Sequence, residues 1–179
     1  AVSQLIECVP NFSEGIDVAV IKQITDAIEA VDGVTLLDVD PGVDTNRTVV
    51  TFVGAPEPVI EAAVRAAVKA KELIDMRTHT GAHPRFGAMD VCPLVPVANI
   101  TMDEVVSYAH RLAERLGMEV GISGFLYEYA AKIPERRNLA TCRAGEYEAL
   151  RERLSDPAWK TDFGLGTFDP AYGVTAVGA

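Results

Sequence analysis

The stretch "VTLLDVDPGVDTNRTVVTFVG", residues 34–54, decides the fold of this chain. Its two halves, residues 34–40 and 46–54, are rich in the β-branched residues that are typical of strands. The linker "PGVDT" between the two halves has the composition of a turn. The stretch therefore predicts two antiparallel strands that are joined by a hairpin with a longer loop.

A helix is predicted on each side of this hairpin. Apolar residues repeat at helical spacing over residues 16–31, where Ser13 offers an N-cap and Gly33 follows the helix end. The same spacing recurs over residues 57–75, and Pro58 fits the first turn of that helix. Both helices are amphipathic, so we expect them to pack against the strands of the hairpin.

Two further strands complete the order of elements. "QLIECV" (4–9) precedes the first helix, and "VCPLVPV" (91–97) follows the second. Pro93 and Pro96 argue against a central position for the later strand, because proline cannot donate to a sheet ladder. The order strand-helix-strand-strand-helix-strand predicts an α/β fold of the α+β class, a ferredoxin-like split βαβ sandwich. Its sheet is expected to be antiparallel or mixed, with helices on one face.

The remaining elements are predicted from local patterns. A capping-box pattern at residues 101–104 begins a helix that ends near Leu116. A strand is expected over residues 119–128 and a single helix over residues 139–154. The end of the chain, "YGVTAVGA" (172–179), has the pattern of a strand that is cut off before it forms. We therefore expect the chain to be one half of a larger unit.

Composition limits the class of protein. The chain has 179 residues, of which 49% are hydrophobic and 23% charged, which suits about one globular domain. Its net charge of −10 argues against a nucleic-acid partner, because phosphate binding needs a basic face. No run approaches the roughly 18 apolar residues of a membrane span, and the first residues lack a signal-peptide pattern. We expect a cytoplasmic protein with no membrane or nucleic-acid partner.

The cysteines are three in number, Cys8, Cys92 and Cys142, and they lie far apart without a C-x-x-C motif. Neither a disulfide framework nor a zinc knuckle fits this spacing. We expect all three to be reduced residues of the core, which also favours a cytoplasmic location.

Two histidines lie on a stretch that is stiffened by glycine and proline, "HTGAHPRFGAMDVCPLVPV" (79–97). Residues 79–90 of this stretch are named the histidine loop. His79 and His83 have the spacing of a helical zinc site, but the glycine between them and the proline after them disfavour a helix. No third ligand follows at a recognisable spacing, so no metal site is expected.

His83 is the candidate for acid-base chemistry, because an imidazole titrates near pH 6.5 and both takes and returns a proton at neutral pH. Pro84 restricts the backbone of His83 to extended conformations and so limits where the ring points. Arg85 is a candidate to hold an anionic group of a substrate, and Asp90 or Asp40 is a candidate to orient the imidazole. The alternative is a rigid turn with a hydrogen-bonded histidine and no chemistry.

Two other features leave alternatives open. The tail "DFGLGTFDPAYGVTAVGA" (162–179) suits either a loop that lines a flat heteroaromatic ligand or an ordinary surface loop. Arg136, Arg137 and Arg143 suit either a solvated helix face or a cradle for a carboxylate. The sequence has no G-x-S-x-G, P-loop or dinucleotide fingerprint, which removes the commonest nucleophile and nucleotide motifs.

These motifs together resemble the N-terminal subdomain of the glutamate formiminotransferase family. The likeness runs nearly end to end through motifs in one order, "ECVPNFSEG" (7–15), "LLDVD" (36–40), "TNRTVVTFVG" (45–54), "HTGAHPRFGAMDVCPLVPV" (79–97), "RAGEYEAL" (143–150) and "DFG...YG" (162–173). The resemblance implies two ferredoxin-like α/β subdomains with folate bound in the cleft between them. Residues 1–179 then form the first subdomain, and the second subdomain is not part of this sequence.

The resemblance also implies an activity. The family transfers a formimino group from N-formimino-L-glutamate to N5 of tetrahydrofolate in histidine degradation, with tetrahydrofolate as co-substrate and no metal. Its catalytic histidine lies in a G-x-H-P-R-x-G motif that falls here on residues 81–87, which makes His83 the general acid and base. An aspartate that resembles Asp40 lies near the site. The folate-contacting segment of the family, named here the glycine-rich segment, falls on Gly164, Leu165, Gly166, Thr167, Phe168, Asp169, Pro170, Ala171, Tyr172 and Gly173.

This sequence departs from the family at one point of that segment, since Gly164, Leu165 and Gly166 stand where the family often has Gly-Pro-Ser. The partners implied are a second subdomain in the same or another chain, and a homodimer. Three alternatives stay open: a folate-binding module without turnover, a structural domain without a ligand, and formyl transfer between 5-formyltetrahydrofolate and glutamate. The resemblance does not decide whether the subdomain is active alone.

Overall fold

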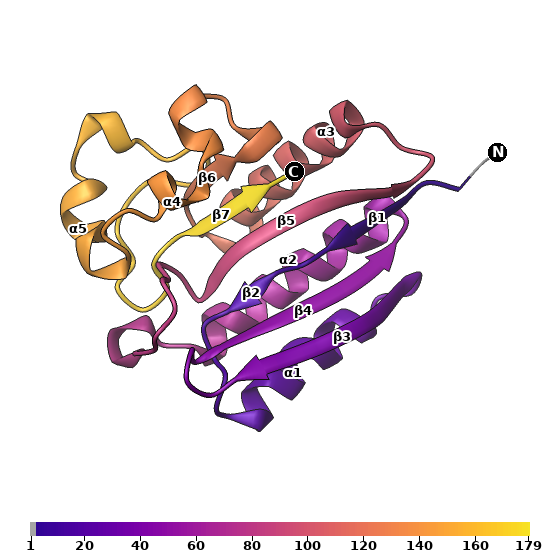
Figure 1. Ribbon diagram of the computed structural model, residues 1–179, viewed down its shortest axis with the longest axis horizontal. Coiled ribbons are helices and arrows are strands. Elements are labelled where there is room, and N and C mark those ends of the chain that lie inside the picture. The colour runs from indigo at the N-terminus through magenta and orange to yellow at the C-terminus, as the bar shows by residue number, and fades with distance from the viewer. Residues whose placement is uncertain (1–2) are drawn as a thin grey trace.

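The predicted hairpin lies at one end of a seven-stranded mixed sheet in the computed structural model, which describes residues 3–179 (Figure 1). Its strands β3 (Val34–Gly42) and β4 (Arg47–Gly54) pair antiparallel, as expected. The sheet continues from β4 through β1 (Leu5–Cys8) and β2 (Asn11–Phe12), β5 (Met89–Ala98), β7 (Thr175–Gly178) and β6 (Gly124–Tyr127). The chain is therefore a mixed α and β protein of the expected class.

Three long helices cover one face of the sheet, α1 (Val18–Glu29), α2 (Pro56–Leu73) and α3 (Met102–Arg115) (Figure 1). Each buries an apolar stripe at helical spacing, such as Ile21, Ile24 and Ile28 of α1. The capping box of α3 forms as predicted between Thr101 and Glu104. The N-cap prediction for α1 was wrong, because Asp17 caps this helix while the Ser13 hydroxyl donates to Gly87 O.

The other face of the sheet is covered only at the β6 end within residues 3–179. Alternate residues of β5, β7 and β6 enter two cores, and the core on this face contains Phe86, Val91, Phe125, Tyr127, Cys142, Leu150, Val174 and Ala176. Two short helices, α4 (Leu139–Cys142) and α5 (Leu150–Arg153), close this second core. Over β1, β3 and β4 the same face is open, and Val95 and Val97 of β5 are 41% and 51% exposed.

The prediction of one helix over residues 139–154 was therefore wrong. Gly145 and Glu146 have φ of 78° and 57°, and left-handed residues cannot continue a right-handed helix. The N–H of Tyr147 instead donates to Arg85 O, so this turn is tied to the histidine loop. Single helical turns complete the chain at Met76–Thr78 (η1), Leu116–Val120, Glu128–Ala130, Pro134–Arg137, Tyr147–Ala149 and Pro157–Trp159.

Three strands differ from their predictions. The strand expected over residues 119–128 is shortened to β6, because Leu116–Val120 and Glu128–Ala130 form helical turns on either side of it. Residues 175–178, expected to be a strand that is cut off, form β7, which is fully buried and pairs parallel with both β5 and β6. β5 is accordingly central despite its two prolines, and Pro96 lies beyond the end of its pairing with β7.

All three cysteines are buried and free, as predicted, and burial raises the pKa of Cys8 and Cys142 above that of an ordinary thiol. Both thiols therefore stay protonated at neutral pH and act as core residues. None of the helices within residues 3–179 has the length and apolar character that crossing a membrane requires.

Candidate active site

The histidine loop leaves η1 and packs on the turn between β3 and β4. The N–H of Ala82 donates to Asp44 O, and a side chain at Gly81 would clash with Thr45 O. The Nε2–H of His79 donates to Asn46 O at 2.9 Å, because a carbonyl oxygen only accepts. The remaining ring nitrogen of His79 accepts from Arg85 Nε at 3.2 Å, so both ring nitrogens are engaged and the ring is fixed.

Both ring nitrogens of His83 are also engaged, but with the opposite tautomer. Nδ1–H donates to Pro84 O at 2.6 Å, since the carbonyl oxygen only accepts. Nε2 therefore carries the lone pair and accepts from Arg47 Nη1 at 2.6 Å. The pKa of His83 is lowered chiefly by burial and further by the cations Arg47 and Arg143. His83 is thus a neutral imidazole with an unprotonated Nε2, which is the form a general base needs.

The two aspartates expected to orient the His83 ring do not bond to it. Asp90 is 2% exposed and accepts from the N–H groups of Phe86 and Gly87 and from Arg143 Nη1 at 2.8 Å. Burial raises the pKa of Asp90, while the arginine and the two N–H groups act against that shift. Asp90 therefore fixes the backbone after His83, and the Pro84 carbonyl orients the ring.

Asp40 does not contact the His83 ring but lies on the same face of the sheet as Arg47. It is an exposed residue of the edge strand β3 and pairs with Val49 of β4, two positions along the ladder from the Gly42–Arg47 pair. Because directly paired residues share a face and side chains alternate along a strand, Asp40 and Arg47 lie on the open face of the sheet.

The Arg85 guanidinium, expected to be free for a substrate, is already occupied. It donates to both carboxylate oxygens of Glu148, at 2.9 and 2.8 Å, and to His79 O. The same bonds hold the pKa of Glu148 below its usual range. Arg85 is 8% exposed and its guanidinium bonds to protein groups, so it positions the histidine loop.

The glycine-rich segment runs from the edge of the sheet to the histidine loop. At its start, Gly166 N–H donates to Ser123 Oγ at 2.9 Å. At its end, Gly173 has φ of 79° and forms a bridge with Gly87, where a side chain on either glycine would clash with backbone. The segment therefore meets the histidine loop through backbone contacts. Its last residue, Gly173, pairs with Gly87, which lies four positions after His83 in the sequence.

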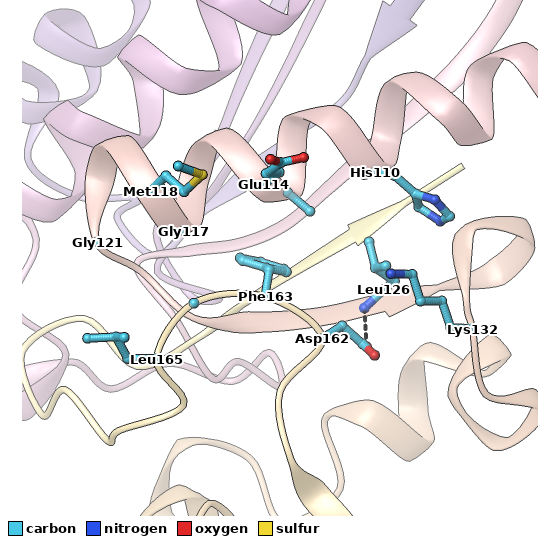
Figure 2. Close-up of a pocket in the computed structure, with 12 residues that line it drawn as sticks. His110, Glu114, Gly117, Met118, Gly121, Leu126, Lys132, Asp162, Phe163 and Leu165 are labelled. Carbon is cyan, nitrogen blue, oxygen red and sulfur yellow. Dashed lines mark hydrogen bonds between the residues drawn. The ribbon is translucent and has the colours of Figure 1, made fainter.

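A cavity of about 700 Å³ lies at the start of the glycine-rich segment, and neither His83 nor Arg47 nor Asp40 lines it (Figure 2). The ring of Phe163 lies at its centre, between α3 and β6, and Leu165 lies at its edge. Lys132 and His110 line the side opposite Leu165. His110 itself donates from Nε2 to Ala130 O, so its ring is tied to the wall of the cavity.

Within residues 3–179, no group of three or more His, Cys, Asp or Glu side chains is arranged to hold a metal ion. The nitrogens of His79 and His83 are directed to separate partners, Asn46 and Arg85 for the first and Arg47 and Pro84 for the second.

Sequence reasoning missed two residues that organise this site, Arg47 and Glu148, and gave a third, Arg143, another role. Arg47 contacts His83, Glu148 holds Arg85, and Arg143 holds Asp90 rather than forming a solvated face or a ligand cradle. For Arg47 a signal did exist, because it starts an alternating strand in which Val49, Thr51 and Val53 face the same way. For the other two pairs the partners are more than 50 residues apart, and no local pattern joins them.

The profile of a known family matches residues 5–179, and it is described as the formiminotransferase domain, N-terminal subdomain. The chain belongs to this family. The match includes every strand and helix, the histidine loop and the glycine-rich segment.

Curated relatives are longer than this chain. A formimidoyltransferase-cyclodeaminase from Gallus gallus is 54% identical over 99% of this chain and 33% of its own length. Glutamate formimidoyltransferases from Streptococcus pyogenes serotype M1 and Thermoplasma acidophilum are 46% and 44% identical over 99% and 98% of this chain. These matches cover 59% and 58% of the two relatives, so the chain spans about a third to three-fifths of the relatives it matches.

Among solved structures, a cyanobacterial arginine dihydrolase overlaps 71% of this chain and 30% of its own, at 13% identity and a TM-score of 0.27. That likeness is too weak to support an argument about fold or function.

Proposed function

We propose that this chain forms half of the active site of a transferase that moves a formimino group from N-formimino-L-glutamate to N5 of tetrahydrofolate. Family membership supports the proposal, as do relatives named glutamate formimidoyltransferase. The observation that carries it is the neutral imidazole of His83, with its proton fixed on Nδ1 and its lone pair on Nε2. A single such ring serves first as a base and then as an acid.

In the proposed reaction N5 attacks the formimino carbon and forms a tetrahedral intermediate. His83 Nε2 takes the proton that N5 loses, and then returns it to the glutamate nitrogen as the bond from that nitrogen to the formimino carbon breaks. The imidazole is neutral again at the end, so one turnover consumes no net proton. Holding both molecules in line contributes up to about 7–11 kcal/mol through effective concentration, without a metal or covalent intermediate.

Tetrahydrofolate is proposed to lie along the glycine-rich segment. The cavity next to Phe163, Gly164 and Leu165 supports this placement, because its apolar floor and aromatic ring suit a flat heteroaromatic molecule. Lys132 on its far side offers a cation for an acidic group. The Gly173 end of the segment brings the binding region to the histidine loop.

Asp40 is proposed to face the substrate from the open side of the sheet, beside Arg47. Arg85 is proposed to position the loop rather than to contact the substrate, because Glu148 and His79 already occupy its guanidinium. A second subdomain, in the same or another chain, is proposed to cover the open face near Val95 and Val97. The longer relatives support this part of the proposal. We further propose a cytoplasmic homodimer, to be tested by light scattering and fractionation.

The direct test is an assay of the full-length protein with N-formimino-L-glutamate and tetrahydrofolate, in which 5-formiminotetrahydrofolate formation is followed spectroscopically. The proposal expects turnover that saturates in both substrates. Folate binding by calorimetry without turnover would favour a folate-binding module, and no binding would favour a structural domain. Turnover only with 5-formyltetrahydrofolate and glutamate would assign the formyl transfer instead.

A further inference from the structure

Arg47 differs from the other arginines around the histidine loop in the kind of partner it has. Three neighbours each hold a carboxylate, in the pairs Arg85–Glu148, Arg143–Asp90 and Arg77–Asp75. Within residues 3–179, Arg47 forms no ion pair, although the chain as a whole carries a net charge of −10. Its guanidinium instead donates to the neutral ring of His83 at 2.6 Å.

A carboxylate is a better partner for this guanidinium than an imidazole is. A carboxylate carries the opposite charge and accepts two parallel hydrogen bonds from a guanidinium, whereas a neutral imidazole nitrogen accepts only one. The strand partner of Arg47 is Gly42, and the Thr45 hydroxyl takes the space that a side chain at Gly42 would fill. An incoming anion would therefore approach Arg47 from the open face of the sheet, with the Thr45 side chain beside it.

The present contact also blocks the chemistry. Arg47 Nη1 occupies the lone pair of His83 Nε2, and the crevice between Arg47, His83 and Asp90 has no space even for a water molecule. His83 becomes a base only after Arg47 moves away from it. A substrate that draws Arg47 away would activate the base in the same step.

We propose that Arg47 binds the α-carboxylate of N-formimino-L-glutamate and that this exchange frees Nε2 of His83. The inference rests on the proposed function, since it names that substrate. The α-carboxylate is attached to the same carbon as the nitrogen that carries the formimino group. A carboxylate on Arg47 therefore brings the reacting nitrogen to the ring atom that Arg47 has left.

The test compares Arg47→Ala with the wild-type full-length protein in steady-state assays. The variant is expected to raise KM for N-formimino-L-glutamate by about 10- to 100-fold, which corresponds to the loss of a charged hydrogen-bonded pair. KM for tetrahydrofolate and kcat should change less than about threefold, because uniform binding is lost. Arg65→Ala, which removes an exposed arginine paired with Glu61 on α2, is the matched control and should change neither constant.

A substrate with an α-carboxamide in place of the α-carboxylate completes the test. For wild type, replacing the acid by the amide should raise KM by as much as Arg47→Ala raises KM for the acid. Arg47→Ala itself should have about the same KM for the acid and the amide. An unchanged KM in the variant, or equal discrimination by both proteins, would overturn the inference. Calorimetry with N-formimino-L-glutamate separates the role of Arg47 from the proposed function. If wild type binds the acid without turning it over, the proposed transferase activity is contradicted and the role of Arg47 is not. Equal affinity in both proteins, or no binding to wild type, contradicts the role of Arg47.

Discussion

The histidine loop and the glycine-rich segment meet at the Gly87–Gly173 bridge, but different forces hold them in place. The histidine loop is tied down by charged side chains from distant parts of the chain, through the pairs Arg85–Glu148 and Asp90–Arg143. The glycine-rich segment is held through its backbone and by the buried ring of Tyr172, while Leu165 within it is 95% exposed. A region that must aim one ring is held by directional bonds between charged side chains, whereas a region that presents a surface is held by its backbone and one buried ring.

The largest effect is expected from breaking the buried pair that holds the histidine loop. Arg143→Ala leaves the Asp90 carboxylate buried without its cation, and such a change costs about 3–5 kcal/mol of unfolding free energy. Urea denaturation measures this loss. Lys22→Ala, which removes an exposed pair with Asp26, is the control and should barely change stability. Equal losses in the two variants would mean that the loop is not held by this pair.

His83→Ala tests the chemistry assigned to the same loop. Turnover by the full-length protein should fall about 100-fold or more, the usual range for a general acid and base. Tetrahydrofolate should still bind, because the glycine-rich segment does not depend on this side chain. Rates and calorimetry together decide the matter, and unchanged turnover would remove His83 from the mechanism.

Gly173→Ala tests the backbone character of the glycine-rich segment. Its φ of 79° costs an alanine about 1–2 kcal/mol, and the new Cβ would also clash with Phe86 O. Gly166→Ala has the same φ, but its Cβ would lie 3.2 Å from Thr161 Oγ1, a tight contact with a side-chain atom rather than the overlap with backbone at Gly173. Thermal unfolding should show the larger loss in Gly173→Ala. Equal losses would mean that close approach to the histidine loop adds nothing.

The pH dependence of the rate gives a smaller effect. Burial and the cations Arg47 and Arg143 lower the pKa of His83, while Asp90 and the bond to Pro84 act in the opposite direction. The basic form is lost as pH falls through this lowered pKa, so kcat/KM should reach half of its plateau below pH 6.5. An acidic limb at or above pH 6.5 would contradict the lowered value.

The regular part of the fold was predictable because it follows simple periods. The apolar stripe of α1, the alternation along β4 and the capping box of α3 are local patterns, and each gave an element of the right type. The failures occurred where distant contacts decide. The turn at Gly145 is tied to Arg85, and β7 is a strand because β5 and β6 bury it on both sides.

The candidate site divides in the same way. Pro84 and its neighbours pointed to His83, and the Gly87–Gly173 bridge links its loop to the segment that was expected to contact folate. The bonds that give His83 its protonation state come from Arg47 and the Pro84 carbonyl. The alternation of β4 indicates the face on which Arg47 lies, but not its contact with His83. Arg85 was read as a free cation because its partner Glu148 lies 63 residues away.

The central claim is that His83 is a neutral ring with its proton on Nδ1 and its basic Nε2 directed to Arg47. Long-range ¹H–¹⁵N spectra of ¹⁵N-histidine-labelled protein at pH 7 test it directly, since the chain has three histidines. We predict that His83 is protonated on Nδ1, in contrast to His79 and His110, whose Nε2 atoms donate to carbonyl oxygens. A His83 ring protonated on Nε2, or on both nitrogens, would contradict this account.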